Sequence, residues 1–399
     1  MARRLITIVL RWMARVFFRR IEIVGDVPRD VPVIFAVNHP NALIDPLFLL
    51  CFAPRRVSFL AKAPLLKMPV IGWIARAFDS IPVYRKQDNV STAQNRETFA
   101  QARAILANGG AIAIFPEGTT HSDPKLRELK TGVSRIALGA GIRVLVIPTG
   151  LYYTSKETFR GSALVVYGQP IVVEGTADEE PPPDLVNPLT ERIEAALANV
   201  TLQADSHEAL ELIDRAERIF SAGQRVTLAQ ELELRKRFVA GYNELCARDP
   251  ARVARLAADI AEVDPPSRRT SVRGAYLLLL PFGFIGAVIH WPVYRLIDLI
   301  ARRADREMAA TVKLIAGAVL YPAEWIVIAI YTRLYALVVL PILGYCAVIA
   351  SETLERLRAR RADVSAIREE IVRIANELTA RSDRASDSPE VATGSSPPG

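Results

Sequence analysis

The sequence predicts an α/β domain in which helices flank a mixed sheet, followed by a helical linking region and by membrane-embedded helices. The sheet is predicted by short apolar runs, rich in β-branched residues, that recur in the first half of the chain and are separated by helix-length segments. Such crossovers between apolar runs indicate substantial parallel pairing in a sheet that is buried on both faces. The membrane part is predicted by apolar stretches, about 20 residues or longer, in the last third of the chain.

The composition narrows the classes of protein and partner. The 399 residues are 51% hydrophobic and 23% charged, with a net charge of +7. This chain is too apolar to be disordered and too charged for a many-helix transporter. The basic residues cluster around apolar segments, which favours a membrane over nucleic acid as the partner. Three widely spaced cysteines exclude a disulfide scaffold and a cysteine-based zinc site, and they suggest a reducing compartment.

Residues 1–20 alternate arginine with large apolar side chains at near-helical spacing. This pattern predicts a basic amphipathic helix that lies in a membrane interface, and the alternative is a surface helix packed on its own domain. In the first case we expect lipid headgroups to be contacted by Arg3, Arg4, Arg11, Arg15, Arg19 and Arg20.

The apolar runs of the predicted sheet lie at 31–38, 111–116, 143–153 and 162–173. Between the first two, residues 88–110 predict a helix that is capped by Asn89 or Ser91 and ends at Gly109 and Gly110. The proline-rich segment 181–188 then marks a boundary. We therefore expect the sheet-bearing domain over 21–180, and a helical linking subdomain over 181–270.

The region 271–350 is predicted to be embedded in the membrane. Gly274 to Tyr294 carries no formal charge, and Leu314 to Ala350 is interrupted only by Glu324 and Arg333, long enough for a hairpin. Basic residues flank these segments on every side, so the positive-inside rule does not choose an orientation, and re-entrant insertion is an alternative to full spans. A charged helix is expected over 351–380 and a disordered polar tail over 381–399.

The first apolar run leads into Asn-His-Pro-Asn-Ala-Leu-Ile-Asp-Pro, which places His39 at a strand end and Asp45 six positions later. In a turn, the Asp45 carboxylate can accept the proton of one ring nitrogen and stabilise the imidazolium that forms when the other nitrogen removes a proton. Pro40 and Pro46 favour a turn over a continuous helix. The alternative is structural: Asp45 caps a helix that begins at Pro46, and His39 merely ends a strand.

Four further positions are candidates for substrate binding. Glu117 and Gly118 follow the second apolar run, where a carboxylate beside a glycine predicts a hydroxyl-binding corner; a Pro–Gly turn with a solvated glutamate is the alternative. Arg85 follows a short extended run, and its guanidinium could bind a phosphate, with Lys130 adding a point charge. A lone arginine is more commonly a solvated surface residue.

The other histidines are His121, which is near enough to Glu117 in the sequence to join this site, His207 and His290. We expect His207 at the surface, and His290 either buried with hydrogen bonds or at the membrane interface. Four dispersed histidines do not form a convincing metal site. The sequence also lacks the nucleophile elbow, the phosphate-binding and dinucleotide-binding loops, and the zinc-protease motif.

Four blocks, taken in order, resemble the glycerolipid acyltransferases, the family of glycerol-3-phosphate and 1-acylglycerol-3-phosphate (lysophosphatidate) O-acyltransferases. They are NHPNALID (38–45), DSIPVYR (79–85), FPEGT (115–119) and VIPTGL (146–151). In that family four residues separate the histidine from the aspartate, whereas here there are five. This longer spacing and the apolar C-terminal region look like the branch that acylates glycerol 3-phosphate, some members of which also accept dihydroxyacetone phosphate.

The resemblance implies a glycerolipid acyltransferase domain over 21–180 that acts in phospholipid biosynthesis at the cytoplasmic face of a membrane. His39 would deprotonate the acceptor hydroxyl, and Asp45 would orient His39. The acceptor and its phosphate would be bound by Arg85, Glu117, Gly118 and Lys130. No metal or other cofactor is expected, because the co-substrate is already an activated thioester, either acyl-CoA or acylated acyl carrier protein. The expected partners are thus this donor, glycerol 3-phosphate or lysophosphatidate as acceptor, and the lipid bilayer.

Three alternatives stay open from the sequence. The acceptor could be 1-acylglycerol 3-phosphate, since the four blocks do not exclude the second acylation. The chain could be a noncatalytic membrane lipid-binding protein on the same fold, which is disfavoured by the presence of His39, Asp45, Arg85 and Glu117. A lipid hydrolase or transacylase is disfavoured by the missing serine motif.

Overall fold

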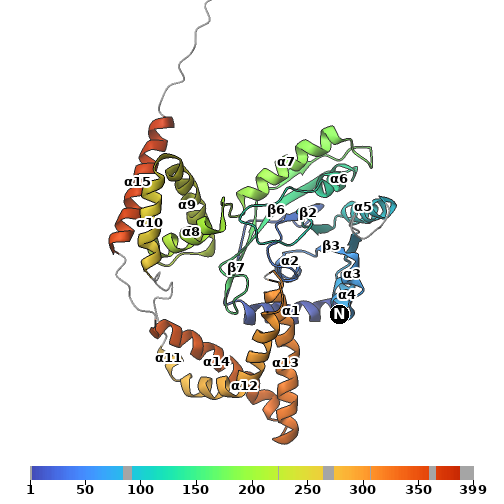
Figure 1. Ribbon diagram of the computed structural model, residues 1–399. Helices are drawn as coiled ribbons and strands as arrows, with labels where there is room; N and C mark the ends of the chain where they lie inside the picture. The colour runs from blue at the N-terminus through green and yellow to red at the C-terminus, as the bar shows by residue number, and fades with distance from the viewer. Residues whose placement is uncertain are drawn as a thin grey trace, which may run out of the picture. The chain divides into compact units, whose positions relative to one another are not determined.

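The computed structural model describes residues 2–83, 92–222, 224–263, 274–305, 307–358 and 365–386. The chain divides into two compact units, whose elements are labelled in Figure 1. Unit 1 comprises Met1–Gln203 and Ala275–Ser351 and contains the sheet and most of the apolar helices. Unit 2 comprises Ala204–Gly274 and Glu352–Gly399, and its described elements are helices.

Unit 1 is built on an eight-stranded sheet. The strands are β1 Arg20–Val24, β2 Val33–Val37, β3 Ser58–Lys62, β4 Ile81–Val83, β5 Ala111–Ile114, β6 Val144–Tyr153, β7 Ser162–Tyr167 and β8 Ile171–Val173. Their order is β1-β7-β6-β2-β5-β3-β4, with β8 pairing with β6. The strands β7 and β8 run antiparallel to β6, and the other pairs are parallel. The predicted mixed sheet with substantial parallel pairing is therefore confirmed.

The predicted strand runs differ from the observed strands in two respects. The run at 162–173 forms two strands instead of one, because the chain turns at Gly168, whose N–H donates to the carbonyl of Pro148 (2.8 Å), and Pro170 has no N–H for a ladder. Periodicity also missed β1 and β3, because each has only five residues and mixes charged with apolar side chains.

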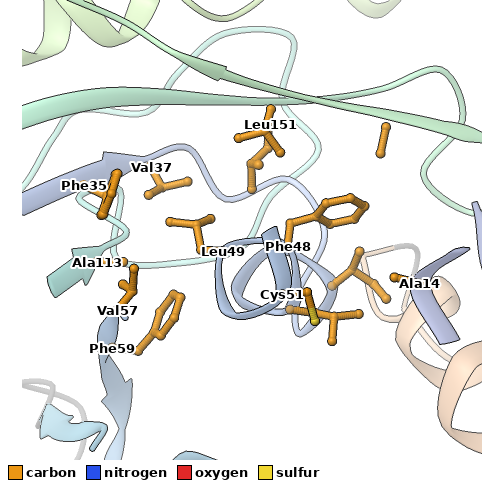
Figure 2. Packing of buried hydrophobic residues seen from close by; sticks show 14 of the residues in the cluster. Ala14, Phe35, Val37, Phe48, Leu49, Cys51, Val57, Phe59, Ala113 and Leu151 are labelled. Carbon is orange, nitrogen blue, oxygen red and sulfur yellow. The ribbon is translucent and has the colours of Figure 1, made fainter. Parts of the chain in front are cut away.

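Helices cover both faces of the sheet (Figure 1). Within this part of the chain they are α1 Ala2–Phe17, α2 Ile44–Phe52, α3 Ala63–Leu66, α4 Pro69–Ala77, α5 Thr92–Ala107, α6 Gly132–Leu138 and α7 Pro183–Asn199. Because side chains alternate along a strand, β2 sends Phe35 into one apolar layer, with α1 and α2, and Ile34 into the other, with α5, α6 and α7. Figure 2 shows Phe48, Leu49 and Cys51 of α2 in the first layer. Every residue of β2 is fully buried, as predicted for a sheet covered on both faces.

The end of α5 agrees with the sequence prediction. Gly109 adopts a positive φ of 70°, and its N–H donates to the carbonyl of Leu106 (2.8 Å), while the N–H of Gly110 donates to Ile105 (2.9 Å). A left-handed glycine with these bonds is a common way to end a helix. The predicted caps, Asn89 and Ser91, lie outside the described residues.

Helix α1 is amphipathic, as the sequence predicted, but two of its arginines bond to protein groups that the sequence did not predict. Its inner side packs on the sheet layer through Ala14 and Phe17, while its outer side leaves apolar residues exposed: Leu5, Ile8, Val9 and Trp12. Arg3 bonds to Asp79 (3.1 Å), and Arg11 donates to the carbonyl of Cys51 (3.0 Å). Protein acceptors thus bind both guanidinium groups, and the contact of the arginines with lipid headgroups stays a prediction. The exposed apolar side supports an interfacial position.

The helical linking region begins later than its predicted start at 181. Helix α7 buries Val186, Ile193 and Leu197 in the sheet layer of α5 and α6, so it belongs to unit 1. Unit 2 consists of α8 His207–Phe220, α9 Leu228–Arg248, α10 Pro250–Glu262 and α15 Ser365–Ser386, together with the end of α14. His207 is exposed at the start of α8, as predicted. The predicted disordered tail, 381–399, overlaps α15 up to Ser386 and otherwise lies outside the described residues.

The apolar region forms α11 Gly274–Leu277, α12 Leu280–Ala301, α13 Ala309–Tyr331 and α14 Ala336–Arg358. Among the described residues, α12, α13 and α14 are long and apolar enough to cross a membrane. The apolar run over 314–350 forms two helices, α13 and α14, which are joined by residues 332–335 and share a small apolar cluster near this connection. His290 of α12 is buried and hydrogen-bonded, which was one of its two predicted environments.

Candidate active site

The candidate site lies where two parallel strands end side by side. Strands β2 and β5 pair in register from Val33 with Ala111 to Ala36 with Ile114, so both chains leave the sheet at the same edge. His39 follows β2 by two residues, and Glu117 follows β5 by three. The carboxyl ends of parallel strands are the usual place for a ligand site in an α/β sheet. The sheet thus brings together two of the predicted segments, 38–45 and 115–119.

A tight turn brings His39 and Asp45 into contact. Ala42 adopts a positive φ of 36°, and the N–H of Ile44 donates to the carbonyl of Asn41 (2.9 Å), which reverses the chain. The Nδ1 atom of His39 then lies 2.8 Å from Oδ2 of Asp45. Since this bond occupies Nδ1, the ring nitrogen left for proton transfer is Nε2. The His39 side chain keeps 14% of its surface exposed, and that of Asp45 keeps none.

The structure argues against the alternative in which Asp45 only caps a helix. Helix α2 begins at Ile44, before Asp45, and no side chain caps it. Instead, Oδ2 of Asp45 accepts the N–H of Asn41 (2.7 Å) as well as the His39 bond. Its other oxygen, Oδ1, accepts the hydroxyl of Tyr153 (2.7 Å). The buried carboxylate therefore has three hydrogen-bond partners, and two of them, the N–H of Asn41 and the Tyr153 hydroxyl, hold it against the third, His39.

Tyr153, at the end of β6, is a site residue that the sequence analysis missed. Burial, then the charge of Asp45 and the hydrogen bond to it, raise the pKa of Tyr153 well above its usual value of 10.0. The phenol therefore stays protonated and remains a donor to Asp45. Its position, 108 residues after Asp45, gave no sequence signal for the pairing beyond its place in a predicted strand.

The ring of His39 is fixed by stacking as well as by Asp45. Phe115 lies parallel to it, with ring centroids 4.1 Å apart and an interplanar angle of 19°. Upstream, Asn38 pairs with the backbone of Leu151 in β6: its Nδ2 donates to the carbonyl (3.1 Å), and its Oδ1 accepts the N–H (2.6 Å). Asn38 thereby ties the start of the turn to the fourth sequence block, so little freedom remains for His39.

Glu117 contacts the backbone of His39 and is buried. Its Oε1 accepts the N–H of His39 (2.9 Å), and its Oε2 accepts the N–H of Arg127 (3.1 Å) and a bond from Nε2 of His121. This placement differs from the predicted hydroxyl-binding corner, because both carboxylate oxygens are already bonded to protein groups. It also differs from the alternative of a solvated glutamate, since only 1% of the side-chain surface is exposed.

His121 closes a ring of hydrogen bonds around this carboxylate. The N–H of Asp123 donates to Nδ1 of His121 (3.2 Å), so the neutral tautomer places its proton on Nε2, which donates to Glu117. The backbone N–H of His121 donates to the carbonyl of His39 (3.3 Å). Both backbone groups of His39 are therefore held from this one loop. The predicted proximity of His121 to Glu117 is found in the structure.

Gly118 and Lys130 lie together at the edge of this loop. Gly118 adopts a positive φ of 70°, and a Cβ atom placed on it would lie 2.8 Å from Nζ of Lys130. The N–H of Lys130 donates to the carbonyl of Pro116 (2.9 Å), which holds the ammonium-bearing residue beside the turn. Arg85 lies outside the described residues; the strand before it, β4, ends at Val83.

Comparisons with known proteins place this geometry in context. Residues 20–152 match the family model described as Acyltransferase. The Saccharomyces cerevisiae protein named glycerol-3-phosphate O-acyltransferase 2 is 34% identical over 171 residues, which cover 41% of this chain and 23% of that protein. The one named glycerol-3-phosphate O-acyltransferase 1, also from yeast, is 27% identical over 343 residues, covering 61% of this chain and 45% of that protein.

A further relative is named as an acyltransferase of 1-acylglycerol 3-phosphate. A 1-acyl-sn-glycerol-3-phosphate acyltransferase of Chlamydomonas reinhardtii is 29% identical over 133 residues, covering 33% of this chain and 38% of that protein. In each of these three cases the chain spans less than half the length of the relative it matches. The similarity thus extends to both kinds of glycerolipid enzyme that the four sequence blocks resemble.

Proposed function

We propose that this chain, whose residues 20–152 match the Acyltransferase family model and which is similar to glycerolipid acyltransferases, acylates glycerol 3-phosphate in phospholipid biosynthesis. The donor is an acyl thioester of CoA or of acyl carrier protein, and no cofactor is required. The observation that carries this proposal is the bond between half-buried His39 and buried Asp45, which leaves Nε2 of His39 for the acceptor hydroxyl.

In the proposed reaction Nε2 of His39 removes the proton of the acceptor hydroxyl as its oxygen attacks the carbonyl carbon of the thioester. The Nδ1–H bond to Asp45 stabilises the imidazolium that results. When the tetrahedral intermediate collapses, the carbon–sulfur bond breaks, the new ester bond remains, and the imidazolium returns its proton to the leaving thiolate. The donors on Asp45 keep this carboxylate in place through both steps.

The remaining predicted residues take supporting roles in this proposal. Glu117 positions the backbone of His39, and Gly118 leaves the space in which the Lys130 ammonium lies. We assign Lys130, together with Arg85, to the acceptor phosphate, because Lys130 lies beside the turn at Gly118 and because an ammonium and a guanidinium group both suit a phosphate. The acyl chain of the thioester donor would reach the site from the bilayer, and the exposed apolar side of α1 supports contact with the bilayer.

Two observations favour glycerol 3-phosphate over the lysolipid. The five-residue separation of His39 from Asp45 resembles the glycerol-3-phosphate branch. Two of the relatives with matching segments carry the names of glycerol-3-phosphate acyltransferases. The second candidate, acylation of 1-acylglycerol 3-phosphate, is favoured by the relative from Chlamydomonas reinhardtii. A noncatalytic lipid-binding role is disfavoured by the intact hydrogen-bond system around His39.

The test is an acyl-transfer assay on the full chain in detergent, with labelled acyl-CoA. Glycerol 3-phosphate, dihydroxyacetone phosphate and 1-acylglycerol 3-phosphate are offered separately to the wild type and to His39→Ala. The matched control is His207→Ala, which removes an exposed histidine of unit 2. We expect transfer to glycerol 3-phosphate, retained by the control and reduced by about 10²-fold or more in His39→Ala, the scale of a lost general base.

The other results divide the alternatives. Transfer to the lysolipid alone would keep the chemistry and replace the acceptor. Equal activity in the wild type and His39→Ala would refute the assignment of the base. Binding of acyl-CoA and lipid without transfer to any of the three acceptors, also with acyl carrier protein as donor, would support the noncatalytic function.

A further inference from the structure

The start of α13 is built into the sheet domain. Ala310 is fully buried in the apolar layer of α1 and α2, and Lys313 donates from Nζ to the carbonyl of Glu157 (2.8 Å). Just before the helix, Glu307 accepts a hydrogen bond from the hydroxyl of Ser122 (2.8 Å), in the loop that contains His121. The connection between α12 and α13 therefore lies on the same face of the membrane as the candidate active site.

The helices of unit 2 come from both sides of the apolar region and pack together. Ile219 of α8, Ile260 of α10 and Ile371 of α15 share one buried cluster. Arg252 of α10 also bonds to Glu370 of α15 (2.7 Å). The chain therefore leaves this unit at α10, passes through the apolar helices, and returns at α15 on the face where it began.

The passage from the sheet domain into unit 2 does not cross the membrane. Of the described residues before 264, none belongs to a candidate span. Residues 204–263 are consequently in the compartment of the sheet domain. Between residue 263 and the buried start of α13, the described residues contain one candidate span, α12, and both ends of that passage lie on one face. A single crossing would place them on opposite faces.

We propose that α12 is a re-entrant helix that enters and leaves the membrane on the face of the active site, and that α13 and α14 form a two-span hairpin. Their connection, residues 332–335, then lies on the opposite face. This arrangement gives an even number of crossings between the two parts of unit 2, whereas three full spans would give an odd number.

The residue types and the length of α12 also support a re-entrant helix. Trp291 and Tyr294 lie in the middle of the helix, followed by Arg295, whose guanidinium lies 6.0 Å from the Trp291 ring. Tryptophan, tyrosine and arginine are typical of the membrane interface. The part of α12 that precedes its first charged residue, Leu280 to Tyr294, rises only ~22 Å at ~1.5 Å per residue. This uncharged part is shorter than the ~30 Å hydrocarbon core, although the whole helix is not. Pro292 also interrupts the helical hydrogen bonds at this point.

Polar and close backbone contacts hold α12 against the hairpin. His290 bonds through Nδ1 to Glu324 of α13 (2.6 Å) and through Nε2 to the carbonyl of Leu340 in α14 (3.1 Å). A carbonyl only accepts, so Nε2 of His290 is the donor in the bond to Leu340. At Gly286 a Cβ atom would lie 2.1 Å from the carbonyl oxygen of Leu343, so the backbones touch.

The outer side of α12 is a lipid-facing surface. Phe284, Val288 and Trp291 are 71%, 59% and 61% exposed and recur at helical spacing. We therefore assign the acyl chains of the leaflet on the active-site face as the partner of this surface.

The test places single cysteines on both sides of each apolar helix in the full chain. Cys246→Ser removes the half-buried native thiol; Cys51 and Cys346 are buried, and burial raises the pKa of Cys51 to about 12, so it is a poor nucleophile near neutral pH. Into this background we would introduce, one at a time, four substitutions at exposed positions: Glu262→Cys, Asp305→Cys, Leu334→Cys and Glu369→Cys. The background without a new cysteine is the control.

Each variant is reconstituted into sealed vesicles of one orientation and treated with a membrane-impermeant maleimide, before and after detergent. We expect Glu262→Cys, Asp305→Cys and Glu369→Cys to label together, and Leu334→Cys to show the opposite accessibility. If Asp305→Cys and Glu262→Cys lie on opposite sides, α12 crosses and the proposal is refuted. If all four label from one side, the hairpin does not cross and the proposal is equally overturned.

Discussion

The substitution Asp45→Asn tests how the charge of Asp45 contributes to the proposed chemistry, because the asparagine can keep nearly every contact. Its oxygen can take the place of Oδ2 and still accept the N–H of Asn41 and the Nδ1–H of His39. Its amide nitrogen then takes the place of Oδ1, where the Tyr153 hydroxyl changes from donor to acceptor. The shape, the ring orientation and the histidine tautomer are thus retained, while the negative charge is lost.

The expected magnitude follows from the distance between the charges. The bonded atoms Nδ1 and Oδ2 are 2.8 Å apart, so the charge centres of the imidazolium and carboxylate are separated by roughly 4 Å. At an effective dielectric constant near 20 this pair is worth about 4 kcal/mol. Because the imidazolium forms in the transition state, we expect a loss of about 10³-fold in kcat/KM for Asp45→Asn.

The assay follows the thiol released from acyl-CoA at several acceptor concentrations, with the unfolding temperature in detergent as a parallel measurement. Asp45→Ala is the matched control, since it leaves the Tyr153 hydroxyl and the N–H of Asn41 without their acceptor. We expect the alanine variant to lose stability as well as activity, and the asparagine variant to lose chiefly activity. A kcat/KM for Asp45→Asn within tenfold of the wild type would refute the charge argument.

Four shorter predictions concern other contacts. His121→Leu removes a donor to buried Glu117 and should lower kcat/KM by about 10- to 100-fold, the kinetic equivalent of 1–3 kcal/mol, whereas His121→Gln should restore most activity; equal losses would exclude a positioning role. Gly118→Ala forces a side chain into the positive-φ region and should lower the free energy of unfolding by about 1–2 kcal/mol in denaturant titrations. Because the pKa of Tyr153 is raised in the folded state, its contribution to stability is present below pH 10 and declines as the pH rises further, so Tyr153→Phe should flatten the alkaline fall in unfolding temperature; an unchanged fall would contradict this. His290→Leu should lower the free energy of unfolding in detergent by about 1–3 kcal/mol, because it leaves Glu324 of α13 without its hydrogen-bond partner. The double variant, His290→Leu with Glu324→Leu, should recover part of this loss.

The sequence predicted the elements of the site better than their contacts. The pairing of His39 with Asp45 could be expected because the prolines around them favour a turn, which shortens the distance between residues that are near in the chain. Tyr153 could not be assigned to Asp45 in the same way, because that contact depends on the pairing of β6 with β2. Strand order and register are set by packing in three dimensions, and a single sequence does not show them.

The lack of three-dimensional information in a single sequence also explains why the contacts of Glu117 and of the α1 arginines were not predicted. A carboxylate beside a glycine looks alike in a sequence whether it faces a substrate or the protein, and only the parallel neighbour β2 places a backbone N–H against it. Charge and periodicity predicted an amphipathic α1, but they did not predict that Asp79 and the carbonyl of Cys51 would bind Arg3 and Arg11. Long-range acceptors of this kind are invisible to local pattern analysis.

The two bonds on the peptide groups of His39 have a consequence for the thermodynamics of turnover. Glu117 fixes the N–H of this residue and His121 fixes its carbonyl, so the backbone has almost no rotational freedom before a substrate arrives. The conformational entropy of His39 is then lost when the chain folds, and no further entropy is lost to order this residue in each catalytic cycle. Folding in turn must desolvate a carboxylate, which makes this loop a place where activity and conformational stability are set by the same hydrogen bonds.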